Sequence, residues 1–177
     1  MSDDGSVVTI SGGTVILNAQ GDGLDSNGSI SQSCGTVIVY GPTANNNGAI
    51  DYNGTYTFSA GFLLAIGSSG MAEAPSSVSQ NTLSINTATI SAGTWLALTD
   101  ASGQAVVAFK TPKTISSIVF SSIHLTTGTM NLVTIDPLSE TVMEQVNVSV
   151  LTTLTSFTVT SGLTTSGGTG GSTRPRP

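Results

Sequence analysis

The chain has 177 residues and a mass of 17.8 kDa, which fits one domain and is long enough to bury a hydrophobic core. Only 8% of the residues are charged and 38% are apolar, and glycine, serine and threonine are abundant, a composition typical of extracellular all-β proteins. The net charge of -6 and the four basic residues exclude nucleic acid as a main partner, because nothing neutralises a run of phosphates.

The sequence contains no membrane-spanning segment, no recognisable signal peptide and one cysteine. No stretch approaches the ~20 consecutive apolar residues of a membrane span, so we expect no membrane insertion. Residues 1–30 lack the basic segment and the apolar segment of a signal peptide. The single cysteine, Cys34, has no partner for an intrachain disulfide, and we expect it to be a small buried side chain.

An internal repeat runs through the first part of the chain. Residues 11–17 (SGGTVIL) return as 33–39 (SCGTVIV) and, less closely, as 59–65 (SAGFLLA), at intervals of about 22 and about 26 residues. A second segment, 23–28 (GLDSNG), returns in the same order as 49–54 (AIDYNG). Each repeat therefore predicts a strand, a glycine-containing turn, a second strand and a polar loop.

This repeat predicts a short parallel β-helix of about three coils over residues 1–75, and its right-handed sense is implied only by the family resemblance given below. One coil cannot bury its own apolar face, whereas stacked coils pair their backbones and share a continuous core. In such a stack Val15, Val37 and Leu63 form one inward column. The repeat ends at residues 73–77 (EAPSS).

Beyond the repeat, residues 76–165 predict an antiparallel or mixed β region that packs on the coils or caps them. Alternating and β-branched segments predict strands at 82–90, 95–98, 105–109, 116–122, 130–134, 146–151 and 156–160. Residues 100–103 (DASG) are typical of a hairpin turn. Residues 166–177 (SGGTGGSTRPRP) predict a flexible tail. The predicted fold class is therefore all-β.

Four segments carry a resemblance to a known family. They are 21–28 (GDGLDSNG), 35–43 (GTVIVYGPT), 47–52 (NGAIDY) and 67–76 (GSSGMAEAPS), with a looser match over 92–109 and 156–165. They are similar to the C-terminal half of the secreted, calcium-binding, right-handed β-helix family of carbohydrate-binding domain-containing proteins. The resemblance implies a cell-surface or extracellular protein that binds acidic or cellulosic polysaccharide. Members of that family are longer, and this chain opens at a late coil.

The acidic loops are the candidate calcium site, with Asp22, Asp25, Asn27 and Asp51 as ligands. In the repeat register Asp25 lies one coil below Asp51, at a strand spacing of about 4.8 Å. Ca²⁺ takes six to eight oxygen ligands, and a bound ion would remove the repulsion between the two carboxylates. Asp and Asn also cap their own backbone in tight turns, and this alternative stays open.

We do not expect an enzyme. Asp25 and Asp51 stack along one edge and do not face each other across a sugar, as glycoside hydrolysis requires. The first 109 residues contain no lysine or arginine that could act as the base of a lyase. The candidate carbohydrate-binding side chains are instead the rings and amides of Tyr40, Tyr52, Asn45 and Asn46.

Two functions are consistent with these features. The leading expectation is a non-catalytic, extracellular or cell-surface module that binds polysaccharide and holds a structural calcium ion. The alternative is a self-assembling subunit of an extracellular filament or surface layer, because an uncovered first coil leaves an open strand edge that a neighbouring copy can pair with.

Overall fold

The computed structural model describes residues 3–167, and this range contains strands, turns and loops but no helix, so it contains no helix that could cross a membrane. The predicted all-β class is confirmed. The strands are β1 (Val7–Asn18), β2 (Leu24–Ser26), β3 (Ser29–Tyr40), β4 (Ile50–Tyr52), β5 (Tyr56–Phe58), β6 (Phe62–Gly67), β7 (Ser77–Val78), β8 (Thr82–Ile90), β9 (Trp95–Asp100), β10 (Ala105–Lys110), β11 (Ile115–Ser121), β12 (Gly128–Ile135), β13 (Val142–Val146), β14 (Val150–Val159) and β15 (Leu163–Ser166).

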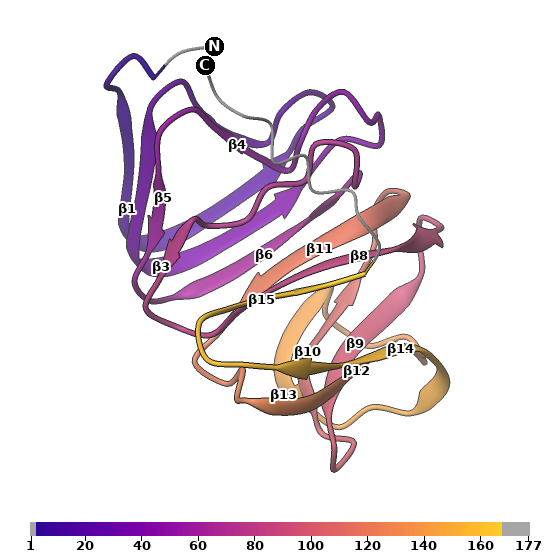
Figure 1. The fold of residues 1–177 in the computed structure, drawn as a ribbon. Helices are drawn as coiled ribbons and strands as arrows, with labels where there is room; N and C mark the ends of the chain where they lie inside the picture. The colour runs from indigo at the N-terminus through magenta and orange to yellow at the C-terminus, as the bar shows by residue number, and fades with distance from the viewer. Residues whose placement is uncertain (1–2, 168–177) are drawn as a thin grey trace.

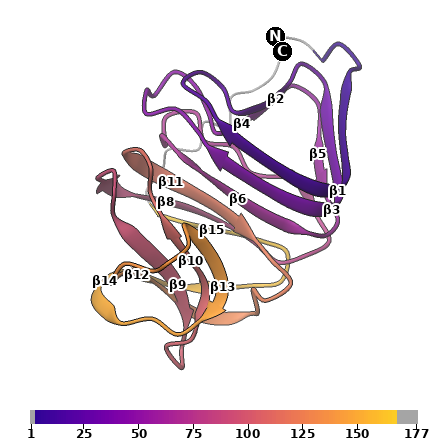
Figure 2. The ribbon, with the colours of Figure 1, turned by 180° about the vertical axis from the view of Figure 1, so that it is seen from behind.

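These strands form three sheets (Figure 1). The largest has eight strands in the order β15-β8-β11-β6-β3-β5-β7, with β1 paired to β3 off this path. A five-stranded antiparallel sheet has the order β13-β10-β9-β12-β14. The short strands β2 and β4, both labelled in Figure 2, form a parallel pair.

The large sheet is mixed, which corrects the expectation of a purely parallel β-helix. β11 pairs antiparallel with β6, and β8 pairs antiparallel with β11, so strands from the second half continue the sheet that the repeats begin. The sequence could not reveal this, because pairing between distant segments leaves no periodic signal. The fold is therefore all-β, with one mixed sheet, one antiparallel sheet and the short parallel pair of β2 and β4.

Within the first half, the predicted register is confirmed. β1 pairs parallel with β3, and β3 with β6, so Val15, Val37 and Leu63 lie in one column. The pair β2–β4 aligns Asp25 with Asp51. The stack also extends further than the repeat predicts, because β7 pairs parallel with β5.

A column of glycines lies where each coil turns: at the bends of β1 and β3, and between β5 and β6. Figure 1 shows the bends of β1 and β3. Gly13, Gly35 and Gly61 have φ angles of 74°, 84° and 117°. A Cβ added to Gly35 would lie 2.9 Å from the carbonyl oxygen of Gly13, and one added to Gly61 would lie 2.5 Å from that of Gly35. Both the conformation and the close approach therefore require glycine in the second and third members of the column.

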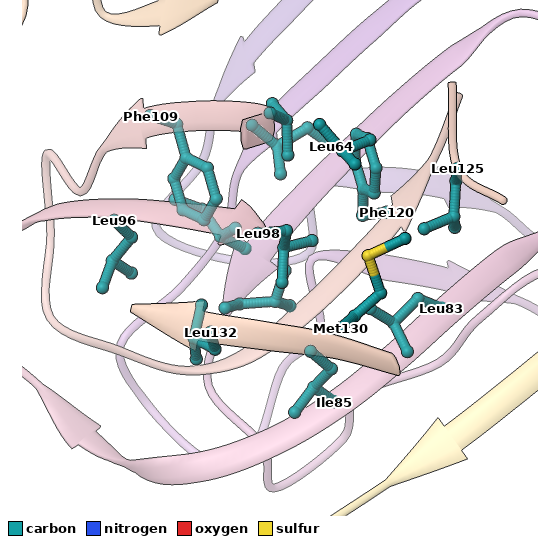
Figure 3. Close-up of a cluster of buried hydrophobic side chains, with 14 of the residues drawn as sticks. Leu64, Leu83, Ile85, Leu96, Leu98, Phe109, Phe120, Leu125, Met130 and Leu132 are labelled. Carbon is teal, nitrogen blue, oxygen red and sulfur yellow. The ribbon is translucent and has the colours of Figure 1, made fainter. Parts of the chain in front are cut away.

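Two hydrophobic clusters lie on opposite faces of the large sheet. Leu64 of β6 and Phe120 of β11 belong to the cluster between the two large sheets, where Figure 3 shows them near Leu98 of β9. Leu63 of β6 and Val119 of β11 belong to the cluster inside the stack. Because β6 and β11 contribute to both clusters, the two halves of the chain share their packing.

In the second half, the strand predicted at 82–90 has the same bounds as β8, and the hairpin turn between β9 and β10 is confirmed. Ser102 donates to the Asp100 carboxylate from its side chain and its backbone, and these bonds hold the pKa of Asp100 below its ordinary value. The strand predicted at 146–151 is wrong, because the chain leaves β13 there and enters β14. β13 and β15 were not predicted, since both are short edge strands with little apolar alternation.

Two further expectations concern the burial of Cys34 and the flexible tail at residues 166–177. Cys34 is exposed and not buried, because it lies at the bend of β3, where its register partner is Ser11 of the outermost strand. Of the tail predicted at 166–177, Ser166 ends β15, and residues 168–177 lie outside the described residues.

Candidate functional site

Asp22 connects the loops of two successive coils. Its Oδ1 accepts a hydrogen bond from the backbone N–H of Gly48 at 2.8 Å. Asn47, with its amide nitrogen turned toward the carboxylate, donates to Oδ2 of Asp22 at 3.3 Å. Asp22 therefore holds the loop of the next coil and does not cap its own turn, and this structural role needs no bound ion.

Asp25 and Asp51 are register partners in the parallel pair of β2 and β4. Asp25 and the nearby Asn27 are exposed, and Asp51 is half-buried. Residues 3–167 contain no group of three or more His, Cys, Asp or Glu side chains placed to hold a metal ion. Two carboxylates and an amide leave most of six to eight coordination positions to water, so the donor set fits a weak site and not a tight one.

Calcium binding at these loops stays a prediction, and the number of available ligands determines the expected affinity. Sites with few charged ligands bind calcium with dissociation constants of about 0.1–1 mM. We therefore expect about 10 mM calcium to raise the Tm of the wild type by a few degrees relative to chelator, and Asp25→Ala combined with Asp51→Ala to abolish this rise. An equal loss of Tm in chelator and in calcium, measured by scanning calorimetry, would show that the two carboxylates stabilise the loops without an ion.

The two candidate tyrosines do not form a stacking platform. Tyr52 is 7% exposed, its hydroxyl donates to the carbonyl of Ala74 at 2.8 Å, and its ring meets Tyr56 edge-on at 6.1 Å. Tyr40 is half-buried against the other hydrophobic cluster, and this burial raises the pKa of its hydroxyl. The two rings thus pack on different clusters, which removes the joint aromatic surface that the sequence suggested.

An open pocket of about 330 Å³ includes the candidate residue Asn45. It lies between the loops that follow β3 and β6 and the paired strands β8 and β11. Ala88 and Ile115 are its apolar members, and no charged residue lines it among the residues described. The other lining side chains are serine and threonine hydroxyls, among them those of Thr43, Ser68, Thr87, Thr89, Thr114 and Ser116.

Hydrogen bonds fix the two walls of this pocket. Ser68 Oγ donates to Asn45 Oδ1 at 2.5 Å, which joins the two coil loops. Ser116 Oγ accepts from the backbone N–H of Ser69 at 2.9 Å and donates to Ser69 Oγ at 3.1 Å, which joins the loop to β11. The pocket is therefore held in shape by the same polar groups that line it.

A bulge of three residues in β8 forms one side of the pocket. Pairing with β11 passes from Asn86 opposite Ser117 to Ile90 opposite Ile115, so residues 87–89 face a single residue of the partner strand. The same three residues line a second pocket of about 290 Å³, on the side of β14 and β15. The sequence predicted the strand but not the bulge; the only signal is the run Asn86–Thr89 (NTAT), which interrupts the apolar alternation.

Lys113 is a site residue that sequence reasoning missed. Its ammonium group donates to the carbonyl oxygens of Ala19, Tyr40 and Gly41, where β1 and β3 end. Desolvation lowers the pKa of this lysine. Because an ammonium has three donors, these three carbonyls leave none for an anionic ligand. The chain separation of 94 residues between Lys113 and Ala19 hides this contact from any local pattern.

One predicted residue, Asn45, thus lines the pocket, whereas Asn46 beside it does not, and both are exposed. Asp25 and Asp51 are brought together on a separate strand pair. No protein-family model matches the chain, and no curated protein and no solved structure matches it either.

Proposed function

We propose that the chain is a non-catalytic polysaccharide-binding module that holds a neutral sugar unit in the pocket of Asn45. The observation that carries this proposal is the chemistry of the lining, which consists of hydroxyls and an amide with no charge among the described residues. Serine, threonine and asparagine side chains donate and accept hydrogen bonds, as sugar hydroxyls do. The commitment of Lys113 to three carbonyls favours a neutral glycan over an acidic one.

The size of the pocket supports a single sugar unit within a longer chain. A volume of about 330 Å³ lies at the lower end of the range of ligand sites. The pocket is open, so a polymer can continue past it on either side. A hexose has about 12 non-hydrogen atoms, and at about -0.3 kcal/mol per atom its affinity is expected to be millimolar. Tight binding to a polysaccharide then requires multivalency, in which several sugar units of one polymer bind several copies of the protein.

The experiment is affinity electrophoresis in gels that contain a neutral glucan, a neutral mannan or polygalacturonate. We expect a neutral polysaccharide to retard the wild type, and Asn45→Ala or Thr114→Val to weaken the retardation about tenfold, since each removes a hydrogen-bonding group worth about 1.4 kcal/mol. Asn46→Ala is the matched control, because Asn46 is exposed next to the pocket but does not line it.

Three outcomes would contradict this function. The first is an absence of retardation by every neutral polysaccharide. The second is retardation by polygalacturonate alone, which would favour the acidic ligands that the resemblance also implies. The third is an equal loss in Asn46→Ala and Asn45→Ala, which would place the binding surface on the exposed loop and not in the pocket.

The fold around the pocket also supports a finer assignment. We infer that residues 7–78 form a short solenoid of the parallel β-helix type, to which β11 adds an antiparallel strand and β8 a further strand that pairs antiparallel with β11. The support is the parallel, in-register pairing of β1–β3–β6, β3–β5–β7 and β2–β4. The low charge of the chain and the family resemblance support a location at the cell surface or outside the cell.

A further inference from the structure

The first strand of the stack has an open edge. In the part of the chain that the structure describes, β1 pairs on one side only, with β3. Its sequence, VVTISGGTVILN, contains neither a charged residue nor a proline, the groups that normally protect such an edge from pairing. Val7 and Ile16 are 60% and 61% exposed. A neutral, apolar edge of twelve residues is a template for another strand.

The side chains of β1 also leave the end of the inner core partly uncovered. Val8, Val15 and Leu17 pack against the inner cluster but are only partly buried, whereas Val37 in the next coil is fully buried. Gly13 repeats the positive φ of the glycine column, yet a Cβ on Gly13 would meet no atom within 4 Å. The first coil therefore has the form of an interior coil for which residues 3–167 supply no outer neighbour.

We propose that β1 is a homodimer interface in which two copies pair antiparallel about a two-fold axis between Gly12 and Gly13. In this register Val8 lies opposite Leu17 of the second copy, and Ile10 lies opposite Val15. All four side chains face the inner core, so the pairing joins the two cores into one. The sequence of β1 permits this because its inward-facing apolar positions are symmetric about the two glycines, whereas the outward-facing positions are not.

The backbone hydrogen bonds agree with the same register. The carbonyl of Ser6 accepts from the N–H of Ser29 at 2.8 Å, so Ser6 directs its polar groups toward β3. The N–H of Ala19 donates to Tyr40 at 3.0 Å, which fixes the other end in the same way. Polar groups alternate between the two sides of a strand.

This alternation leaves five residues of the two regular arms of β1 with their N–H and C=O groups on the open side. On the first arm these are Val7 and Thr9, and on the second arm they are Thr14, Ile16 and Asn18, because each arm pairs regularly with β3. In the proposed register Val7 lies opposite Asn18 of the second copy, and Thr9 lies opposite Ile16. Each pair can then exchange both hydrogen bonds, as directly opposed residues of an antiparallel ladder do.

The arrangement closes as a dimer and does not continue as a filament. Head-to-tail stacking of the coils would need a matching long edge at the far side of the same sheet, but β11 covers β6 in the antiparallel direction, and the edge strands β7 and β15 have only two and four residues. The other long uncharged edge, β14, belongs to the five-stranded antiparallel sheet and does not continue the stack. A two-fold contact between identical surfaces closes on itself. The seam is neutral, so the net charge of -6 on each copy does not place like charges within the ladder.

The size of the contact sets its strength. Twelve residues at about 3.4 Å each and a width of about 10 Å give about 400 Å² per copy, or about 800 Å² in total. This lies below the roughly 1,200 Å² of stable interfaces, so the dimer is expected to dissociate on dilution, with a dissociation constant in the micromolar range or weaker.

Sedimentation equilibrium with charge-reversal variants tests the interface and its register together. The wild type is expected to shift from 17.8 kDa toward twice that mass as its concentration rises. Thr9→Lys with Ile16→Lys places like charges directly opposite each other and should weaken the dimer at least tenfold, whereas Thr9→Lys with Ile16→Glu should restore it. Both side chains are exposed, and an unchanged Tm of the monomer serves as the control for folding.

A disulfide provides the second measurement. In a Cys34→Ser background, Thr9→Cys with Ile16→Cys should form covalent dimers on mild oxidation, and Ile16→Cys alone should not. A wild type that stays monomeric up to about 1 mM would overturn the interface. A dimer that the Lys–Glu variant fails to restore, or that the double cysteine variant fails to cross-link, would overturn the register. Species larger than a dimer would overturn the closed symmetry.

Discussion

Gly35→Ala is expected to lower the free energy of unfolding by about 3 kcal/mol. A left-handed backbone costs an L-residue about 1–2 kcal/mol, and Gly35 has a φ of 84°. The added Cβ would also lie 2.9 Å from backbone atoms of Gly12 and Gly13, and such overpacking costs about 1–3 kcal/mol. Urea unfolding at a protein concentration low enough to keep the chain monomeric measures the loss.

The chain offers a matched control for this variant in Gly93→Ala. Gly93 has a φ of 83°, but a Cβ there would meet no atom within 4 Å. The control should therefore lose only the conformational part, about 1–2 kcal/mol. If the two variants lost the same stability, the coils would not approach each other as closely as the structure has them.

Tyr56→Phe is expected to cost about 1–3 kcal/mol, because it leaves a buried acceptor without its donor. Tyr56 is completely buried, and its hydroxyl donates to Gln32 Oε1 at 2.7 Å. Gln32 Nε2 in turn donates to the carbonyl of Phe62 at 3.2 Å, so the pair connects three strands inside the stack. Thermal or urea unfolding of the variant gives the cost directly.

The pH dependence of this cost has a definite sign. Burial, with a smaller contribution from Tyr52, raises the pKa of Tyr56 well above its ordinary value of 10.0. A raised pKa means that the folded state keeps its proton, so the contribution of Tyr56 is complete below pH 10 and falls as the pH rises above it. The stability difference between wild type and Tyr56→Phe should therefore be constant from pH 6 to about 9 and shrink above pH 10. A difference that grows above pH 10 would contradict the burial of this hydroxyl.

The order of the stack was readable from the sequence because each coil repeats the same local requirement. The recurring glycine and the alternating apolar residues after it fix which positions superimpose, and the observed pairs Val15–Val37 and Val37–Leu63 follow. Likewise Asp25 and Asp51 became neighbours because each follows an apolar residue at the same place in its coil. Where a repeat determines the register, the local sequence is sufficient to predict which residues pair between neighbouring strands.

The candidate site was harder to predict from the sequence, because its walls come from segments that share no repeat period. Asn45 was expected in a polar loop, but the opposite wall depends on the bulge of β8 and on the antiparallel pairing of β11 with β6. Tyr52 was expected at the surface, and the parity of its short strand turns it inward. The contact between Lys113 and Ala19 joins residues that no nearby pattern relates.

The most direct test of the account is NMR mapping of a neutral oligosaccharide on the labelled protein. A ligand held in the pocket should shift the backbone amides of Asn45, Ser69, Ala88 and Ser116, all of which belong to lining residues, with a millimolar dissociation constant. Shifts confined to Asp25 and Asp51, or the absence of any shift at saturating neutral sugar, would contradict it.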